Sequence, residues 1–374
     1  MKILQTLIRQ ISARYQVCTL GLVVALLPLT ISAQVQNPSG GLQPTEASDI
    51  WAQTLEGSHF NEFWTYHFFL DDGMKMHLTF SAANFGSLKD PVTGVRISLF
   101  NFDGETYQMS REYPLEKLIQ DEDTYRFRLR DERTVWFEGA LPEEHRVRIN
   151  TSKDGVTYDI DIDFSNIVQG LKWSNGLYSI ENEPVGIYTH IPYAEVTGKI
   201  QINDTRKDVS GTAYMDHTFQ NQTTTRLMDS GYRFISHTDA ENWDIIYALL
   251  PDNHGNDRRI IGHRIQSKDG TPSLRSAYQI MEKQRRRSLG ERYAHTMQFY
   301  MLDLPVEEGG AHLTTIRRTQ DDERFSILSE LSWVARRAAR RFLGGEVIEL
   351  RGEAVMEEMG KEPTSGYYNF FIVD

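Results

Sequence analysis

The stretch VTYDIDIDF at positions 156–164 alternates strictly between apolar and polar side chains. Its even positions carry Val, Tyr, Ile, Ile and Phe, and its odd positions carry Thr and three Asp residues. Because successive side chains of a β-strand point to opposite faces, the pattern predicts a strand with one face buried and the other in water. The same period of two recurs at 125–130 and 74–80. These segments indicate half-buried antiparallel sheet.

Short turn sequences separate the predicted strands. DDG at 71–73 and DG at 103–104 and 154–155 favour hairpins between neighbouring strands. Further strands are expected near 64–70, 95–101, 134–139, 145–150, 193–202, 231–239, 243–250, 258–267, 294–303, 345–357 and 366–373. A meander of this kind loses its exposed edges by closing into a barrel, so we expect an all-β fold of antiparallel barrels.

The length of 374 residues exceeds what one hydrophobic core usually serves, so two domains are expected. An internal repeat supports two. TGKIQI at 197–202 precedes SGTAY at 210–214, and RGEAVM at 351–356 precedes SGYY at 365–368. Each barrel would then end in the same kind of hairpin, with chance similarity as the alternative. The predicted barrels occupy 51–228 and 229–374.

One helix is expected in the second half, at 322–343. Its apolar stripe comprises Phe325, Leu328, Leu331, Val334, Ala335, Ala338 and Phe342, and Arg336, Arg337, Arg340 and Arg341 cluster near its end. The basic face could touch an anionic membrane as a peripheral contact. Alternatively, the helix packs on a barrel wall with its arginines in water, where they complement the helix dipole.

Residues 1–33 are typical of an export signal. Lys2, Arg9 and Arg14 precede an uncharged stretch at 17–33 that closes with small residues. Residues 34–50, rich in Gln, Ser, Gly and Pro, would follow as a flexible tether. We therefore predict an exported protein, periplasmic or secreted, with an uncleaved N-terminal membrane anchor as the alternative.

Composition excludes several functions from the mature chain. The only cysteine, Cys18, lies in the export signal, so disulfides, zinc–thiolate sites and thiol nucleophiles are excluded after cleavage. Without the three basic residues of the signal, the 40 Lys and Arg fall to 37 against 52 Asp and Glu, a net charge near −15. Nucleic acid is not an expected partner of such a chain.

No metal site or cofactor is expected either. The histidines that could converge on a metal, His67, His77, His190, His217 and His237, show no close ligand spacing. The sequence also has no Gly-rich phosphate loop, no nucleophile elbow and no paired zinc-ligand helix.

The most unusual local sequence is GTAYMDHTF at 211–219, at the predicted end of the first barrel. On one strand, Tyr214 and Asp216 share a face while His217 lies on the other, unless a bulge intervenes. The equivalent point of the second barrel is YYNF at 367–370, so the hairpin itself does not require the Asp-His pair. The pair has either a role beyond folding or a structural one, hydrogen-bonding backbone between the barrels.

Here the sequence resembles a known family. YMDH after a Gly-ended hairpin, PYAEVTG at 192–198 and WTYHFF at 64–69 are similar to the carotenoid 1,2-hydratase (hydroxyneurosporene synthase) and AttH-like superfamily. That superfamily also includes survival-factor-like lipid carriers and Diels–Alderases. The resemblance covers most of 51–374 and is specific in 192–219. It implies two tandem lipocalin-like barrels and a hydrophobic ligand: an isoprenoid to hydrate, a polyketide-like chain to cyclise, or a sphingolipid-like molecule to carry.

Under the hydratase hypothesis, an acid protonates an alkene and aromatic faces stabilise the cation. Asp216 is the expected acid, because burial raises a carboxyl pKa. His217 would orient it or pass the proton, and Tyr214 would stand beside it. The expected ligand-binding residues are Trp173, His190, Trp243 and His237, although large aromatics in barrels are often ordinary core.

Three hypotheses follow for the function. An exported carrier of a lipid-like or isoprenoid-like molecule needs only a cavity, and we favour it narrowly. An isoprenoid hydratase, isomerase or cyclase would also need Asp216 as a general acid. A non-catalytic interaction protein of the cell envelope would need neither.

Overall fold

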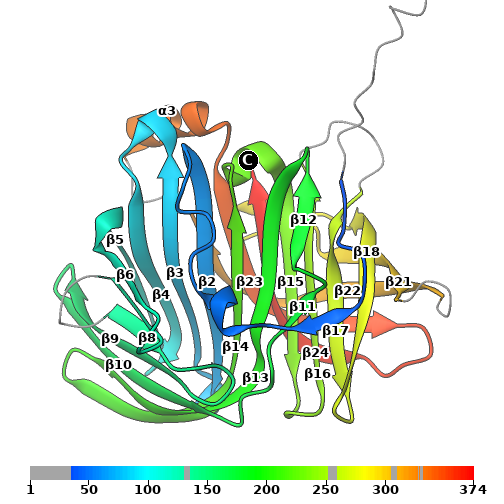
Figure 1. Cartoon of the computed structure of the whole chain (residues 1–374), viewed down its shortest axis with the longest axis horizontal. Helices are drawn as coiled ribbons and strands as arrows, with labels where there is room; N and C mark the ends of the chain where they lie inside the picture. Colours follow the sequence, from blue (N-terminus) through cyan, green and yellow to red (C-terminus); the bar gives the residue numbers. More distant parts are fainter. Residues whose placement is uncertain (1–34, 130–134, 252–258, 305–309, 327, 329–331) are drawn as a thin grey trace, which may run out of the picture. The chain divides into compact units, whose positions relative to one another are not determined.

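The computed structural model describes residues 35–374 except 130–134, 252–258, 305–309, 327 and 329–331 (Figure 1). The expected export signal at 1–33 lies outside the described residues. Among the described residues, no helix has the length and hydropathy needed to cross a bilayer.

The first half of the chain builds one 14-stranded antiparallel sheet. Its strands are β1 (Leu42–Pro44), β2 (His59–Leu70), β3 (Lys75–Phe85), β4 (Val92–Phe102), β5 (Glu105–Pro114), β6 (Leu118–Asp121), β7 (Arg126–Leu129), β8 (Val135–Glu138), β9 (His145–Lys153), β10 (Val156–Ser165), β11 (Leu171–Trp173), β12 (Leu177–Ile180), β13 (Glu183–Ile202) and β14 (Thr205–Gln220). Short 3-10 turns lie at η1 (Ala47–Ile50), η2 (Asp71–Gly73), η3 (Gly86–Leu88) and η4 (Leu115–Lys117).

The main path of this sheet is β5-β4-β3-β2-β14-β13-β10-β9-β8-β7-β6. No described ladder joins its two edges, β5 and β6, yet the sheet curls around one apolar core. Arg111 of β5 donates from Nη1 to the Ser152 carbonyl oxygen at 2.8 Å, and Lys153 Nζ donates to the Ser110 carbonyl oxygen at 2.8 Å. The β5 edge therefore meets the end of β9 through side chains.

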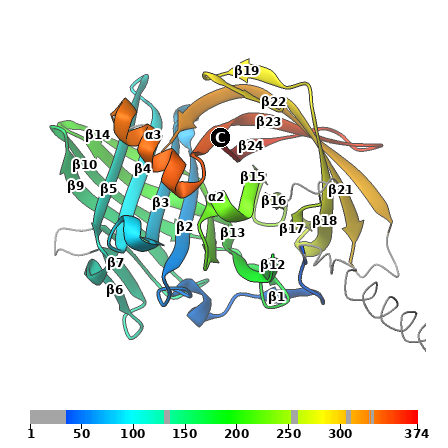
Figure 2. The same cartoon turned by 90° about the horizontal axis from the view of Figure 1, so that it is seen from above.

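The second half forms a closed barrel in the order β15-β16-β17-β18-β21-β22-β23-β24, seen from its end in Figure 2. Its strands are β15 (Met228–His237), β16 (Trp243–Pro251), β17 (Ile261–Lys268), β18 (Thr271–Lys283), β21 (Thr296–Asp303), β22 (Ala311–Phe325), β23 (Val347–Glu358) and β24 (Thr364–Val373). A separate hairpin joins β19 (Arg286–Ser288) to β20 (Glu291–Tyr293), and two helices, α2 (Thr224–Leu227) and α3 (Trp333–Leu343), complete the described elements. The expected fold class is confirmed.

The alternating stretch at 156–164 is β10. Tyr158, Ile160 and Ile162 are buried inside the curled sheet, whereas Asp159 and Asp161 point away from that core. The pattern therefore predicted both the strand and its buried face.

The two repeated segments are the final hairpins of the two sheets. Gly198 lies in β13 and Gly352 in β23. A Cβ on Gly198 would collide with the carbonyl oxygen of Asp161 in the neighbouring strand β10, and a Cβ on Gly352 with that of Gln320 in β22. In both sheets the last strand pairs with the first long strand, β14 with β2 and β24 with β15. The glycines thus allow the same close approach of backbones twice.

The expected helix at 322–343 was too long at its start. Residues up to Phe325 belong to β22, where Phe325 pairs with Glu349 of β23, and α3 begins only at Trp333. Here the backbone hydrogen bonds with β23 stabilise a strand, although the apolar residues are spaced as in a helix. Leu331 lies outside the described residues.

Three apolar cores support this arrangement. One fills the curled sheet, a second fills the barrel, and a third lies between the outer faces of β13 and β14 and the barrel strands β15 to β18. This third core includes Tyr193, Tyr214, Trp243 and Tyr247. The sheet and the barrel therefore share a buried junction.

Candidate functional site

The unusual segment at 211–219 lies in the middle of β14. Tyr214 pairs with His67 of β2, and His217 pairs with Trp64. The register shifts of the β13–β14 pair fall within β13, so the alternation of β14 is unbroken. Tyr214 and Asp216 consequently face the barrel, while Met215 and His217 face the interior of the curled sheet.

Asp216 is fully buried and forms an ion pair with Arg233 of β15. Arg233 Nε lies 2.7 Å from Asp216 Oδ2, and Nη2 lies 3.0 Å from Oδ1. The guanidinium carbon lies 4.8 Å from the centre of the Tyr247 ring, and Nη1 is 3.4 Å from His67 Nε2. We call Tyr214, Asp216, Arg233, Tyr247, His67 and His77 the junction site.

Burial dominates the electrostatics of the junction site. It raises the pKa of the Asp216 carboxyl, and the charge of Arg233 opposes that rise. Burial and nearby arginines hold the pKa of His67 and of His77 well below the ordinary value, so both imidazoles are neutral near pH 7. Burial also raises the pKa of Tyr214. With both imidazoles neutral, the Asp216 carboxyl is the candidate proton donor of the site.

Several polar atoms of the junction have no hydrogen-bond partner among the described residues. Both ring nitrogens of His77 and the indole nitrogen of Trp243 are in this state. The Tyr214 hydroxyl lies beside Asp216 without a hydrogen bond of ordinary geometry. An unpartnered buried donor or acceptor costs roughly 1–3 kcal/mol, so these atoms favour a site that is completed by water or a ligand.

No family model and no curated protein sequence matches this chain. Solved structures do match it. An AttH-type protein from Nitrosomonas europaea is 13 % identical, with a TM-score of 0.58 over 89 % of this chain and 98 % of that one. CghA in complex with Sch210972 gives the same identity, coverage and TM-score. Kievitone hydratase from Nectria haematococca is 11 % identical, with a TM-score of 0.55 over 91 % of this chain and 97 % of that one.

The chain has the lipocalin-like AttH-type fold. The resemblance of the short motifs predicted this fold, and at such low identity the comparison extends to the fold alone. Within the AttH-type fold, the junction site lies where the curled sheet meets the barrel, outside both of their interiors.

His217 does not take the role expected for it beside Asp216. Its Nε2 lies 2.7 Å from Glu62 Oε1, its Nδ1 lies 2.9 Å from the Asp49 carbonyl oxygen, and its ring stacks on Trp64 at 4.6 Å. Strand alternation sends it into the curled sheet, away from Asp216. The expected role of His217 is therefore wrong: it does not contact Asp216, so it can neither orient that side chain nor pass a proton to it directly. Instead, His217 links η1 to β2 through hydrogen bonds.

His190 belongs to the same interior cluster as His217. Its ring is stacked on His217 at 5.8 Å, and it is buried. Lys172 and Asp49 form an ion pair of 2.6 Å in this region. The structure therefore separates His190 from Asp216, although we expected both to contact one ligand.

The remaining expected ligand residues lie in the core of the junction. His237 packs edge-on against Phe69 at 5.5 Å and Tyr193 at 5.3 Å, and burial lowers its pKa to about 4. Trp243 pairs with His237 across β15 and β16. Trp173 donates its indole N–H to the Gly40 carbonyl oxygen at 2.9 Å. The ring nitrogens of His237 and the indole nitrogen of Trp243 have no partner among the described residues and could bond to a ligand. The indole N–H of Trp173 is already used by the Gly40 carbonyl oxygen.

The five histidines considered for a metal do not converge. His67 and His77 lie 4.7 Å apart between ring centres at the junction, while His190 and His217 lie on the other face of the sheet. Within the described ranges, no three His, Cys, Asp or Glu residues are placed to hold a metal ion.

Arg233 is the residue that sequence reasoning missed. It lies in GYRFISH at 231–237, where its neighbours Tyr232 and Phe234 face the barrel core. A single charged residue on the other face of such a strand must point into water or into an interface. That signal was present, but only the fold shows which partner it meets.

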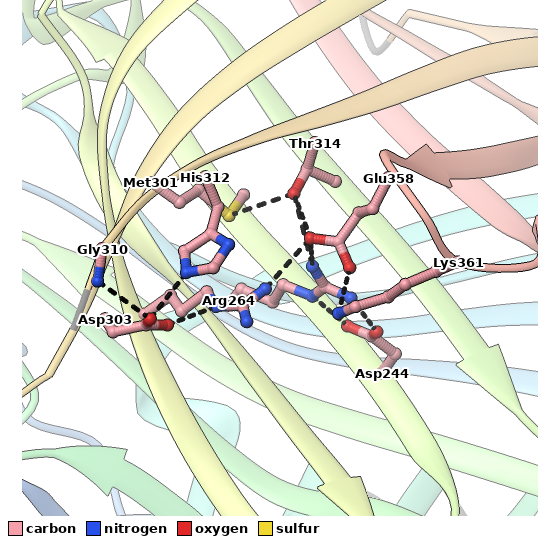
Figure 3. A network of polar contacts seen from close by, with 10 residues as sticks. Asp244, Arg264, Met301, Asp303, Gly310, His312, Thr314, Glu358 and Lys361 are labelled. Carbon is pink, nitrogen blue, oxygen red and sulfur yellow. Dashed lines mark hydrogen bonds and ion pairs between the residues drawn. The ribbon is translucent and has the colours of Figure 1, made fainter.

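Another polar network lies in the barrel, and its charged members are all paired (Figure 3). Arg264 pairs with Ile246 of the barrel core, so its side chain points into the barrel. It contacts Glu358 Oε1 at 2.6 Å and Asp244 Oδ1 at 2.8 Å. Although burial alone would raise it, the pKa of Glu358 is lowered to about 2 by Arg264. The charges of this network thus neutralise one another inside the barrel.

Proposed function

We propose that the chain is a hydratase, isomerase or cyclase that acts on a hydrophobic small molecule at the junction site, with Asp216 as the proton donor. One observation carries this proposal. A buried carboxyl–guanidinium pair lies among unpartnered polar atoms beside the third apolar core. The same interface also holds the ion pairs Arg96–Glu349 and Arg351–Glu323, but Asp216 is the carboxyl next to the unpartnered Tyr214 hydroxyl. Binding an apolar molecule does not require a carboxyl at the site, whereas proton-transfer chemistry requires a positioned acid.

The chemistry that the site supports is addition of a proton to an alkene. The Asp216 carboxyl gives its proton to one alkene carbon, which forms a C–H bond and leaves a carbocation at the other. A water oxygen then forms the C–O bond and returns a proton to the Asp216 carboxylate. Alternatively, a neighbouring carbon gives a proton to that carboxylate, and the electrons of its C–H bond form the double bond at the new position. The Tyr247 and Tyr214 ring faces would stabilise the cation, and Arg233 the carboxylate.

The names of the structural neighbours are compatible with this proposal. Kievitone hydratase is named for a hydration reaction, and CghA was crystallised with the small molecule Sch210972. Neither name assigns a substrate to this chain.

A carrier function is the second candidate. The third apolar core and the neutral histidines would accept an uncharged lipid-like or isoprenoid-like molecule without chemistry. Under either candidate, the basic and then apolar sequence of residues 1–33 supports export to the periplasm or the medium. Fractionation of cells that express the full chain tests export.

Mass spectrometry of organic extracts tests the proposed function. The full-length wild-type chain and its Asp216→Asn variant are purified, incubated with lipid extract of the producing cells, and extracted again. The proposal expects a compound that both proteins bind and that only the wild type converts to a product of altered mass or retention. Binding without conversion by either protein supports the carrier. No bound compound in either would contradict both candidates.

A further inference from the structure

The helix α3 turns its apolar side chains outward, whereas an ordinary surface helix turns them towards the core. None of its residues is buried, and Trp333, Val334 and Phe342 are 72 %, 69 % and 53 % exposed. Apart from Met359, every other exposed large apolar side chain in the described ranges is 37–42 % exposed. Exposed apolar surface is thus concentrated on one short helix.

The arginines explain this orientation. Arg336 donates to the two carboxylate oxygens of buried Glu346 at 2.6 and 2.9 Å. Arg340 lies 3.7 Å from the same carboxylate and 2.7 Å from Asp374 Oδ2. The protein-facing side of α3 is therefore held by ion pairs, and its apolar side is turned outward.

Two parallel stripes run along the outward side. Val334, Ala338 and Phe342 follow one another at four-residue steps, and so do Trp333, Arg337 and Arg341. All six are exposed. The Arg337 guanidinium lies over the Trp333 ring at 5.7 Å, and neither Arg337 nor Arg341 forms an ion pair with another described residue. The outward side is both apolar and cationic.

From this combination we propose that α3 docks the folded protein on an anionic phospholipid surface. Trp333, Val334 and Phe342 would enter the acyl boundary, and Arg337 and Arg341 would contact phosphate groups. The helix at 11 residues is too short to span a bilayer and suits the plane of the interface. This revises the expected membrane contact from 322–343 to Trp333–Leu343.

Charge decides between a membrane and a second copy of the chain. In a two-fold dimer through α3, the arginines of each copy would face those of the other, and like charges repel. An anionic lipid surface complements them instead. The neighbouring β19–β20 hairpin adds exposed arginines at 286, 287 and 292, and its Glu291 pairs with Arg324 at 2.9 Å.

Trp333 is a built-in reporter for the test. The other tryptophans, Trp51, Trp64, Trp136, Trp173 and Trp243, are buried or partly buried. The difference in fluorescence between the full chain and its Trp333→Phe variant therefore isolates Trp333. Phosphatidylcholine vesicles, and vesicles with equal parts of phosphatidylcholine and phosphatidylglycerol, are the two probes.

We expect a blue shift of Trp333 emission and co-sedimentation with the phosphatidylglycerol vesicles only. Each arginine near such a surface contributes about fivefold in affinity, so Arg337→Gln with Arg341→Gln should weaken binding about 25-fold. Phe342→Ser should abolish the blue shift. Arg206→Gln, an exposed arginine on the β13–β14 hairpin, is the matched control and should bind like the wild type.

Three results would overturn the proposal. Trp333 emission could stay unchanged with anionic vesicles. The double arginine variant could also bind as tightly as the wild type, which would assign binding to another part of the chain. Alternatively, the blue shift could follow protein concentration without lipid, together with a Phe342-dependent dimer in analytical ultracentrifugation. These measurements use no substrate, so they are independent of the proposed enzyme activity.

Discussion

Asp216 of β14 and Arg233 of β15 form a buried two-point ion pair across the junction between the curled sheet and the barrel. Their contacts are 2.7 and 3.0 Å long, and the aspartate is fully buried. The pair joins the last strand of one unit to the first strand of the next. It is at once part of the seam that holds the two units together and the acid of the proposed site.

Replacing one partner of this pair should destabilise the fold strongly. Arg233→Met leaves an uncompensated buried carboxyl and should cost about 3–5 kcal/mol in the free energy of unfolding. The double variant Asp216→Leu/Arg233→Met buries no charge and should recover most of that loss. Urea denaturation followed by circular dichroism measures both. A double variant no more stable than Arg233→Met would refute the pairing.

The pH dependence of turnover should report the Asp216 carboxyl. Only its protonated form can donate, so the rate should fall about tenfold per pH unit above its pKa, which burial raises from 3.8. Arg233→Gln removes the charge that opposes this rise, so the falling limb should move to higher pH. Arg233→Lys keeps the charge and should leave the limb near its original place. An identical limb in all three proteins would assign the acid to another group.

Replacing His77 by an apolar residue should stabilise the fold. Its two ring nitrogens are buried without partners, so His77→Leu should raise the free energy of unfolding by about 1–2 kcal/mol near pH 7. Because its pKa is held well below 6.5 in the folded state, the unfolded chain binds the extra proton as the pH falls below 6.5. Wild-type stability should therefore fall more steeply from pH 6.5 to 5 than that of the variant.

His59→Leu is the matched control for that experiment. His59 is partly exposed and hydrogen-bonded to Ser58, so its replacement should change stability by less than about 0.5 kcal/mol. A loss of stability in His77→Leu would mean that His77 is a satisfied structural residue.

The ion pair of Glu358 with Arg264 should make the free energy of unfolding depend on pH below 4.5. The pKa of Glu358 is 4.5 in an unfolded chain and about 2 in the fold, so its stabilisation is complete above pH 4.5 and disappears as the pH falls towards 2. Glu358→Gln should cost about 3 kcal/mol at pH 7 and little at pH 2. Glu357→Gln, which breaks the exposed pair with Arg317, should cost under about 1 kcal/mol. Equal melting temperatures for the two variants at pH 7 would contradict this.

The sequence predicted those parts of the fold that depend on local periodicity. The alternation at 156–164 predicted β10 and its buried face, and the repeated Gly198 and Gly352 predicted the two equivalent hairpins. Alternation also predicted that Asp216 and His217 would point apart. Each of these inferences needs only the sequence of a strand or of a repeated pair of strands.

Features that depend on neighbours distant in sequence could not be predicted. The stripe from 325 onward has a helical period, yet ladder bonds with β23 hold its first residues in β22. Likewise, strand alternation predicted that Asp216 and His217 lie on opposite faces of the strand. It could not predict which of the two faces the barrel, or that Arg233 lies opposite Asp216. The outward turn of α3 follows from Glu346 and Asp374, which the helical pattern does not contain.

The most direct test of the central claim is a comparison of turnover by Asp216→Asn and His217→Gln on the compound that the wild type converts. Asp216→Asn should bind the compound and yield no product, because it cannot donate the proton. His217→Gln breaks the contact with Glu62 and should lose stability, yet at a temperature where it remains folded it should convert the compound at a rate within about tenfold of the wild type. Full activity in Asp216→Asn, or loss of activity in folded His217→Gln alone, would contradict an acid at the junction site.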